Sequence, residues 1–514
     1  MGSKGWTLAA AILGSGIVFL DSTVITVALP RIGQTLPTRL FGVLEGQSYV
    51  YYGYLLTLSS LLILGGALSD AYGRRRTFAL GLAAFGATSV LCGLAPTMEA
   101  LIVFRLLQGA AGALLVPGSL SLITATFDGE EQGRAFGIWA GASGATTILG
   151  PVIGGILVDA ISWRTVFLVN APLVILALWA TLRHVDESHG AGDTGHFDWT
   201  GALVGAMAVG GLTFGPIYGQ QRNWQHPLAF VALAIGALAA VAFPWLMARR
   251  THPLVPLDLF RSRNFTITNL STFVIYGALY VTLYCLLLFM QGTLGYSAAA
   301  AGLAIDPTTI FLVFLSSRVG VLARRHGPRW FMAAGPAIMA LGLLWLARVP
   351  SSSAPWIITP GVAASYLPHG DYLAHFLPGF VLFGIGLAIM VAPLTTCLMT
   401  SVPVGHAGVA SAINNAISRV GPQLAGALIF MAITASFYGD LSQRVLGLDP
   451  FSPLVRAKIA PLNRPAADVP ADHVAAAREA STGAYHLAML LGAALLAAGA
   501  VINAVGIRNP DPGG

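Results

Sequence analysis

Long hydrophobic runs recur along nearly the whole sequence, with short polar segments between them. A helix needs about 20 apolar residues to cross the hydrocarbon core of a bilayer, and backbone polar groups must be paired within it. The pattern therefore predicts fourteen membrane-spanning helices rather than the short alternating strands of a transmembrane barrel. Their approximate limits are 6–29, 48–69, 77–96, 99–125, 133–158, 163–182, 200–219, 227–248, 266–290, 299–323, 331–348, 377–400, 407–436 and 483–506.

The composition agrees with a membrane protein. Charged residues make up only 9% of the 514 residues, and hydrophobic residues make up 56%. Soluble domains carry roughly a quarter charged residues, so the lipid bilayer is predicted to surround most of this chain. The net charge of +6 comes from basic residues in short loops, a distribution that does not indicate nucleic-acid binding. Cys92, Cys285 and Cys397 each lie inside an apolar run, so we interpret them as packing residues and expect no disulfide, metal or cofactor.

Basic residues are divided unequally between the two sides of the predicted membrane region. With the N-terminus placed inside, cytoplasmic segments hold Lys4, Arg74, Arg75, Arg76, Arg134, Arg183, Arg249, Arg250, Arg261, Arg263, Arg324, Arg325, Arg329 and Arg508. Short external loops hold the smaller set Arg31, Arg39, Arg164, Arg222 and Arg348. Because short cytoplasmic loops carry an excess of Lys and Arg, the imbalance predicts both termini in the cytoplasm and an even number of spans.

Two polar linkers divide the chain into three parts. They follow the sixth and the eighth predicted spans, at 183–198 and 249–265. We therefore predict an N-terminal six-helix bundle over 1–183 and an inserted pair of helices with linkers over 184–265. A second six-helix bundle follows over 266–514, and a long external loop at 437–482 lies within it.

Two pairs of similar segments indicate an internal duplication. The sequence GALSDAYGRR at 66–75 matches GVLARRHGPR at 320–329, after the second span of each half. The sequence GPVIGG at 150–155 matches GPQLAG at 421–426, in the fifth span of each half. Both copies keep the same predicted membrane orientation, so the repeat is parallel, as in transporters built from two bundles around a central cavity.

Several of these stretches carry a resemblance to a known family. They are LDSTVITVALP at 20–30, GALSDAYGRRR at 66–76, RLLQGAAG at 105–112, and a span-five stretch at 141–155 that ends in GPVIGG and is followed by WRTVFLVNAP at 163–172. Together they resemble the major facilitator superfamily, and within it the fourteen-helix drug:proton antiporters of the EmrB/QacA type. The resemblance implies a major facilitator fold with two six-helix bundles and a two-helix insertion.

The resemblance also implies that Asp21 and Arg105 couple transport to protons. At 1.5 Å per residue, Asp21 lies about 12 Å and Arg105 about 9 Å from the external ends of their spans, so the two share one layer. A charge at this depth is costly unless it is paired or hydrated. Pairing with Arg105 would hold Asp21 ionised, and protonation of Asp21 would release Arg105. The alternative is a permanent ion pair with no part in coupling.

The loop after the second span is expected to act as a conformational latch. In the family such a loop stabilises one conformation, and its residues here are Gly66, Asp70, Gly73, Arg74 and Arg75. The C-terminal copy has an arginine in place of the aspartate, so a weaker second latch is expected.

The GPVIGG stretch corresponds to the family's antiporter motif. Its residues here are Gly150, Pro151, Gly154 and Gly155. Small residues also permit close helix approach, and this packing interpretation stands beside any direct contact with substrate.

Four further residues are candidates for a substrate cavity. Asp306 lies about 10 Å into the tenth span, where it is interpreted as a site for cations or protons, or as a cap on a helix that Pro307 breaks. Tyr276, Tyr280 and Tyr284 share one face of the ninth span because their spacing is four. They line the cavity or form a packed or lipid-facing stripe.

The sequence excludes several classes of protein and leaves three functions open. It has no nucleotide-binding loop of the Walker type and no visible catalytic cluster, so we expect no enzyme. The main hypothesis is a monomeric, proton-coupled exporter of small amphipathic or cationic compounds such as drugs, in the bacterial inner membrane. The alternatives are an exporter of an endogenous metabolite or lipid, and a membrane sensor that reuses the fold without transport.

Overall fold

The protein is built from helices. The structure, a computed structural model, describes residues 2–38, 43–190, 197–221, 224–359, 362–445, 447–449, 452–466 and 468–509. Within these ranges there is no strand, and the predicted all-α membrane fold is confirmed.

The helices follow the predicted spans closely. The N-terminal half contains α1 (Ser3–Thr35), α2 (Val43–Ser60), α3 (Leu62–Tyr72), α4 (Arg74–Gly93), α5 (Met98–Thr126), α6 (Gly129–Ala160), α7 (Thr165–Leu168) and α8 (Asn170–His184). A hairpin of α9 (Trp199–Gln221) and α10 (Pro227–Arg249) comes next. The C-terminal half contains α11 (Arg263–Leu288), α12 (Ala298–His326), α13 (Arg329–Leu346), α14 (Leu377–Thr400), α15 (Ala407–Arg444), α16 (Pro453–Lys458) and α17 (Ala471–Gly506). Short 3-10 or π turns are η1 (Leu257–Arg261), η2 (Phe289–Leu294), η3 (Ala363–Tyr366), η4 (Tyr372–Phe376) and η5 (Val404–His406).

The number of membrane spans agrees with the sequence pattern to within two helices. Among the described residues, twelve helices are long and apolar enough to cross a membrane, or thirteen if the bent pair α2–α3 counts as one span. Helix α6 has 32 residues and measures about 48 Å at 1.5 Å per residue, longer than a hydrocarbon core of about 30 Å. Counting α6 would give fourteen spans, and this number stays a prediction.

Two predicted spans are interrupted. The span at 48–69 divides into α2 and α3, which meet at Leu61 with a bend of 46°. The bend follows Ser59 and Ser60, and serine pairs are among the usual causes of helix kinks. The span at 163–182 divides into the single turn α7 and the longer α8.

The external loop is shorter than the predicted 437–482. Helix α15 continues to Arg444 and α17 begins at Ala471, so both helices extend beyond their apolar segments. Hydropathy marks only the part of a helix that lies in lipid, and these polar helix ends lie outside that part. The Tyr438 hydroxyl donates to the Ile459 carbonyl at 2.9 Å, which ties the end of α15 to the remaining loop.

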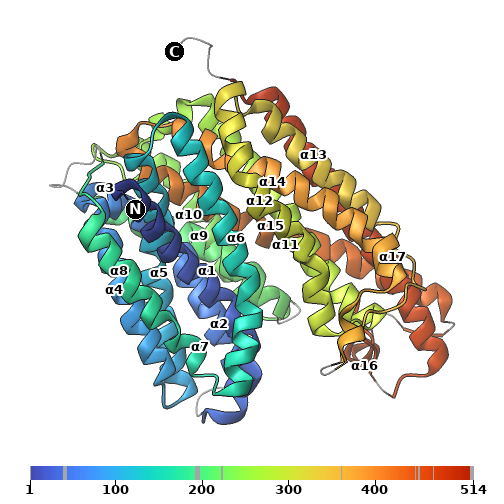
Figure 1. The fold of residues 1–514 in the computed structure, drawn as a ribbon. Coiled ribbons are helices and arrows are strands. Elements are labelled where there is room, and N and C mark those ends of the chain that lie inside the picture. Colours follow the sequence, from blue (N-terminus) through green and yellow to red (C-terminus); the bar gives the residue numbers. More distant parts are fainter. Residues whose placement is uncertain are drawn as a thin grey trace.

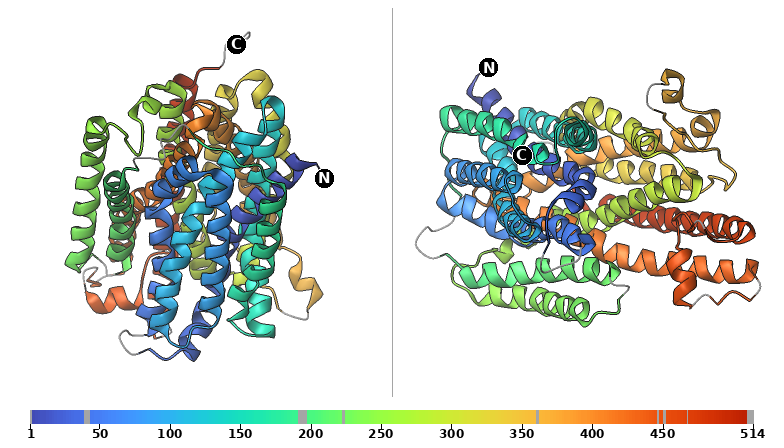
Figure 2. Two further views of the ribbon diagram at one scale, coloured as in Figure 1. Left: turned by 90° about the vertical axis from the view of Figure 1, so that its left-hand side faces the viewer. Right: turned by 90° about the horizontal axis from the view of Figure 1, so that it is seen from below.

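The two halves lie side by side, and the α9–α10 hairpin lies along both (Figures 1 and 2). Helix α3 packs against α15, and α6 packs against α12, so each half supplies one helix to each of two pairs across the boundary. Helix α9 packs against α2 of the first half and α15 of the second. The arrangement supports the predicted division at 183 and 265, which remains a proposal.

The internal repeat reappears as a shared turn. Gly73 separates α3 from α4 with a φ of +104°, and Gly327 separates α12 from α13 with a φ of +84°. These glycines occupy equivalent positions in the two matching stretches. Positive φ is strained for residues with a side chain, so each copy requires glycine here for the chain to reverse.

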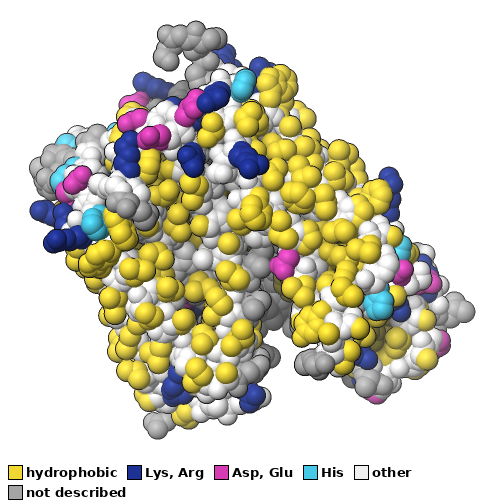
Figure 3. Space-filling view, viewed as in Figure 1, with side chains coloured by type: hydrophobic (Ala, Val, Ile, Leu, Met, Phe, Trp, Pro, Cys, Tyr) yellow, Lys and Arg dark blue, Asp and Glu magenta, His cyan; other side chains and the backbone are white. Residues whose placement is uncertain are grey.

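The surface divides into an apolar belt and a charged end (Figure 3). Exposed hydrophobic side chains are frequent on the outer helices, with Leu238 71%, Val241 78% and Trp245 58% exposed on α10. Lys, Arg, Asp and Glu gather at the end near the two termini, and a second group lies at the opposite end of the C-terminal half (Figures 1 and 3). An apolar belt of this kind matches a bilayer, and the protein is an integral membrane protein.

The halves touch at the end near the termini and separate at the opposite end. At the touching end, a Cβ atom at Gly66 would overlap the carbonyl oxygen of Gly408, and one at Gly320 would overlap that of Gly133. Glycine therefore lets α3 approach α15, and α6 approach α12, backbone to backbone. At the opposite end the surface is hollowed between the halves (Figure 3), and this hollow is called the central cleft below.

Candidate functional site

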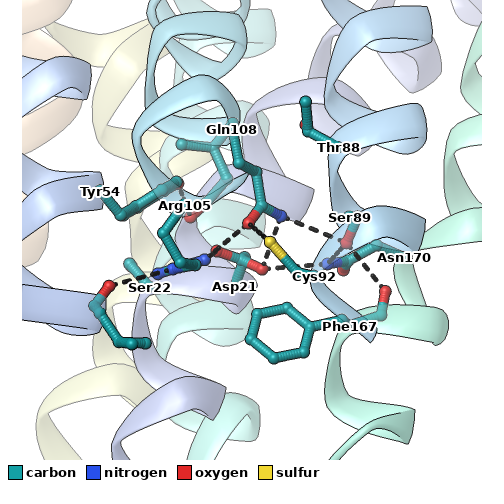
Figure 4. Close-up of polar contacts among 12 residues, drawn as sticks. Asp21, Ser22, Tyr54, Thr88, Ser89, Cys92, Arg105, Gln108, Phe167 and Asn170 are labelled. Carbon is teal, nitrogen blue, oxygen red and sulfur yellow. Dashed lines mark hydrogen bonds and ion pairs between the residues drawn. The ribbon is translucent and has the colours of Figure 1, made fainter. Parts of the chain in front are cut away.

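A buried ion pair forms the centre of the N-terminal half. The Arg105 Nη1 atom on α5 donates to Asp21 Oδ2 on α1 at 2.5 Å, as Figure 4 shows. The Asp21 residue is 2% exposed and Arg105 is 0% exposed. The ring of Tyr54 lies beneath the guanidinium, with 4.1 Å between its centroid and Arg105 Cζ. The structure therefore brings together the two residues that the sequence predicts to couple transport to protons.

A shell of polar side chains orients the Asp21 carboxylate. The Gln108 amide donates to Asp21 Oδ1 at 3.0 Å, and the Asn170 amide donates to the same oxygen at 3.1 Å. Both amides also donate to the Ser89 hydroxyl, which in turn donates to the Phe167 carbonyl at 2.9 Å. With the bond from Arg105, the Asp21 carboxylate therefore accepts three hydrogen bonds, which fix its orientation among α4, α5 and α8.

Sequence reasoning missed three of these shell residues as functional candidates. Gln108 and Asn170 lie within motifs that were recognised, but no role was assigned to them. Ser89 lies beside Thr88 in a mostly apolar run on α4, and no role was predicted for it. Cys92, interpreted as a packing residue, lies with its sulfur 3.5 Å from Gln108 Oε1. Polar residues within predicted spans were the available signal, because such residues are costly in a membrane unless they meet one another.

The pair retains polar atoms without a partner. Within the described residues, Arg105 Nη2 and Asn170 Oδ1 are buried and make no hydrogen bond. Arg105 is otherwise held by its contact with Gln108 Oε1 at 2.8 Å and with the Val50 carbonyl at 3.2 Å. A buried donor without an acceptor is unfavourable, so Arg105 has spare bonding capacity if Asp21 becomes neutral.

The predicted latch joins the two halves. The Asp70 carboxylate accepts from Arg74 Nη2 at 3.1 Å and from the backbone nitrogen of Val409 at 3.0 Å. Arg74 also donates to the carbonyl of Val404, just before α15. Asp70 thus lies at the N-terminus of α15, where the helix dipole favours a negative charge. Asp70 and Arg74 are both buried, and the contact bridges α3 and the C-terminal half.

The second copy of the latch has different chemistry. Arg324, which replaces the aspartate, donates from Nε to the Gly129 carbonyl at 3.1 Å. Arg325 forms two hydrogen bonds to Glu130, at 2.7 and 3.0 Å. These contacts join α12 to the first turn of α6, but they are exposed to solvent.

The linker after α8 closes over the first latch. The Glu187 carboxylate accepts from the backbone nitrogens of Arg75 and Arg76 at 3.0 and 3.2 Å, which caps the N-terminus of α4. The backbone nitrogen of Gly190 donates to the Asp70 carbonyl at 2.7 Å. Sequence analysis assigned this segment only to a polar linker, and its hydrogen bonds give it a defined place at the boundary between the halves.

The antiporter motif lies at a close helix crossing. A Cβ at Gly150 would overlap the Thr23 hydroxyl, and one at Gly154 would lie 3.1 Å from the Val24 carbonyl. Both glycines therefore let α6 approach α1 just beyond Asp21. Nothing lies within 4 Å of a Cβ at Gly155, and the side chain of Pro151 lies outside what the structure describes. The geometry supports the packing interpretation of this motif.

Asp306 does not cap a broken helix. Helix α12 continues through Pro307, so the expected break is absent and that interpretation was wrong. Asp306 precedes Val313 by seven residues, about two helical turns, and Gly141 of α6 packs against Val313. Asp306 therefore lies on the face of α12 that points toward α6, on the side of the contact where the halves separate, and it is partly exposed.

The predicted tyrosine stripe also lies toward the other half. Tyr280 and Tyr284 on α11 are 55% and 53% exposed, whereas Tyr276 is partly buried. Tyr280 lies within electrostatic range of Tyr51 on α2, and Tyr284 lies within range of Tyr52 on the same helix. Both rings therefore lie near α2 of the other half, and their place in a substrate cavity stays a prediction.

Comparisons with known proteins agree with this architecture. The sequence profile of the Major Facilitator Superfamily matches residues 11–426. Multidrug resistance protein Stp of Mycobacterium tuberculosis is 34% identical over 84% of this chain and 76% of that protein. The tetracenomycin C resistance and export protein of Streptomyces glaucescens is 31% identical over 85% of this chain and 77% of that protein. The solved structure of the proton:xylose symporter XylE superposes with a TM-score of 0.56 at 15% identity, over 96% of this chain and 94% of that one, a likeness in fold alone. The chain therefore belongs to the major facilitator superfamily.

Proposed function

We propose that this protein exports small drug-like molecules across the bacterial inner membrane in exchange for protons. The observation that carries the proposal is the buried Asp21–Arg105 pair, in which a carboxylate at membrane depth has Arg105 as its charged partner among the described residues. Such intramembrane charges mark proton relays and substrate pathways. The names of the two relatives, for multidrug resistance and for export, support drug-like cargo.

Protonation of Asp21 is the step that would link protons to movement. Ionised Asp21 accepts hydrogen bonds from Arg105, Gln108 and Asn170. A neutral carboxyl gives up most of its attraction for the guanidinium, which leaves Arg105 to seek other acceptors. A change of partner inside the bundle would alter how α1 and α5 pack, and the close crossing at Gly150 would carry that change to α6.

The closed and open ends of the molecule suggest which side of the membrane the central cleft opens to in this conformation. With both termini in the cytoplasm, the closed end is cytoplasmic and the central cleft opens outward. The latch at Asp70 would then stabilise the outward-open state, from which cargo leaves and a proton enters. Asp306 is retained as a site for cationic groups on the cargo because it faces the other half without an ion pair in the described chain. We further propose that one chain suffices for transport, since the cleft is enclosed by its own two halves.

The energy source is the first test. In proteoliposomes, export of an amphipathic cation such as ethidium should follow the pH gradient and fall to background when a protonophore collapses it, with ATP held constant. The reason is that a secondary transporter draws its driving force from the ion gradient. Export that continues without the gradient would contradict antiport. Binding without transport would instead favour a sensor, and movement of lipids alone would favour a lipid exporter.

The latch is tested by Asp70→Asn. The amide still accepts from Val409 but loses the charge that holds Arg74 and complements the α15 dipole. Because hydrogen bonds to charged groups contribute about 1.5–3 kcal/mol, we expect the turnover rate to fall roughly tenfold, a factor equal to 1.4 kcal/mol. Substrate affinity should stay within about twofold, since the latch lies away from the cleft. Asp186→Asn, at an exposed linker position, is the matched control, and a large loss of affinity with normal turnover would disprove the latch.

A further inference from the structure

Arg419 lies on the side of α15 that faces the other half. Gly408 and Ala412 on this helix pack against Gly66 of α3. Arg419 follows Ala412 by seven residues, about two helical turns, so it lies on the same face and farther toward the open end. Arg419 is partly exposed there, while Val420 beside it is still buried in a core shared with α2, so we place Arg419 at the inner edge of the central cleft.

The guanidinium has no charged partner in the part of the chain that the structure describes. It makes no hydrogen bond and no ion pair there. Three tyrosines lie near enough to interact electrostatically with the guanidinium: Tyr280 on α11, and Tyr51 and Tyr54 on α2. None of the three is an aspartate or a glutamate, so within the described residues no carboxylate compensates the positive charge.

An uncompensated charge within a membrane span requires an explanation. Charged residues inside spans face a water-filled cavity or pair with an opposite charge, and they mark pathways for substrates and ions. Arg105, which is fully buried in the N-terminal half, satisfies this rule through Asp21. Arg419 lies beside the cleft without such a partner, which points to a partner that arrives with the cargo.

We propose that Arg419 binds a negatively charged oxygen group, a carboxylate or phenolate, on an aromatic amphipathic cargo molecule. This inference rests on the proposed function and adds to it. Asp306 is proposed to bind cationic groups of the cargo, and Arg419 is proposed to bind acidic groups. Arginine donates two parallel hydrogen bonds to a carboxylate. The nearby tyrosines offer O–H donors for the same group and ring faces for an aromatic body.

The position of the site also relates it to the proton pair. Tyr51 lies within electrostatic range of both Arg419 and Arg105, and Tyr54 packs its ring on Arg105. A single layer of α2 tyrosines therefore separates the acidic group of the cargo from the Asp21–Arg105 pair. The proposed binding site for the acidic group and the Asp21–Arg105 pair therefore lie on opposite sides of these tyrosines.

The test compares three ligands that share one aromatic body. Naphthaleneacetic acid, its carboxamide and naphthylethylamine are titrated against the purified full-length protein in nanodiscs, and binding is followed by tryptophan fluorescence. Wild-type protein should bind the carboxylate at least about tenfold more tightly than the carboxamide. Arg419→Gln should remove that preference without weakening the amine. Arg419→Lys should retain part of it, because lysine keeps the charge and loses the fork of donors.

Arg249→Gln is the matched control, because it removes an exposed arginine at the end of α10, and the carboxylate preference should persist in it. Equal binding of acid and amide by the wild type would overturn the proposal, and this measurement does not depend on any variant folding. An unchanged preference in folded Arg419→Gln would overturn it as well. The assay measures binding without a proton gradient. A carboxylate preference with no gradient-driven export would therefore refute the proposed function alone, whereas gradient-driven export with no preference would refute this inference alone.

Discussion

Replacement of Asp21 by asparagine is expected to abolish proton-coupled export while the protein stays folded and inserted. The amide preserves the shape of the side chain and removes the titratable charge, so no proton can be exchanged at this position. Export driven by a pH gradient should fall at least about tenfold, a barrier change of about 1.4 kcal/mol. Transport of labelled cargo into everted vesicles, together with the pH dependence of its rate, measures the effect.

Stability must be followed in the same variant, because Arg105 loses its charged partner. Breaking a buried ion pair costs about 3–5 kcal/mol, but Arg105 also donates to Gln108 and to the Val50 carbonyl, which moderates the loss. A lower melting temperature with normal insertion is therefore expected. Asp21→Glu should restore part of the transport because it restores a titratable group. Asp472→Asn, which removes an exposed carboxylate, serves as the control. Wild-type export with an intact pH response in Asp21→Asn would place the proton carrier elsewhere.

The second large effect is expected from Gly66→Ala. One added methyl group would overlap the Gly408 carbonyl and the Ala412 side chain, so α3 and α15 could no longer meet at the closed end. Alanine is a better helix former than glycine, so the helix itself should persist. Overpacking costs about 1–3 kcal/mol, which would shift the balance away from the closed conformation by a factor of about five to about one hundred and forty, with a comparable loss of turnover.

Spin labels at positions 76 and 326 measure this shift directly. Both positions are exposed and lie on different halves, and the native cysteines are all buried. In wild-type protein a short distance should dominate, and in Gly66→Ala a longer one should replace it. Gly483→Ala is the control, since nothing lies within 4 Å of its added Cβ. An unchanged distance distribution with normal transport would show that the Gly66–Gly408 contact does not determine the conformational balance.

The fold was largely predictable because a bilayer imposes its thickness on the sequence. Hydropathy locates the segment of each helix that lies in lipid, and the predicted limits fall within a few residues of most helices. The same signal fails outside the lipid, which is why α15 and α17 extend past their predicted ends. The interruption at Leu61 was also missed, because the serine pair before it bends the helix while the segment as a whole stays apolar.

The site was predictable only at charged residues that lie within predicted spans. Asp21 and Arg105 attracted attention because each is costly alone, and their pairing followed from equal depth. Ser89 gave no such signal, since a small hydroxyl is tolerated anywhere in a span, and its role depends on where α4 meets α5 and α8. Glu187 caps α4 from more than a hundred residues away in sequence, and only the folded chain places the two together.

The two contacts between the halves at the closed end, α3 with α15 and α6 with α12, should respond differently to salt. The α3–α15 contact includes the buried Asp70–Arg74 pair, whose side chains are 5% and 1% exposed. The Glu130–Arg325 pair beside the α6–α12 contact has both side chains more than half exposed. Mobile ions screen exposed charges over about 8 Å at physiological ionic strength, but they screen buried ones far less. Rising ionic strength would therefore weaken one side of the barrier and leave the other intact. The halves would then separate first between α6 and α12 and remain joined between α3 and α15, so the direction of opening would be fixed before any cargo binds.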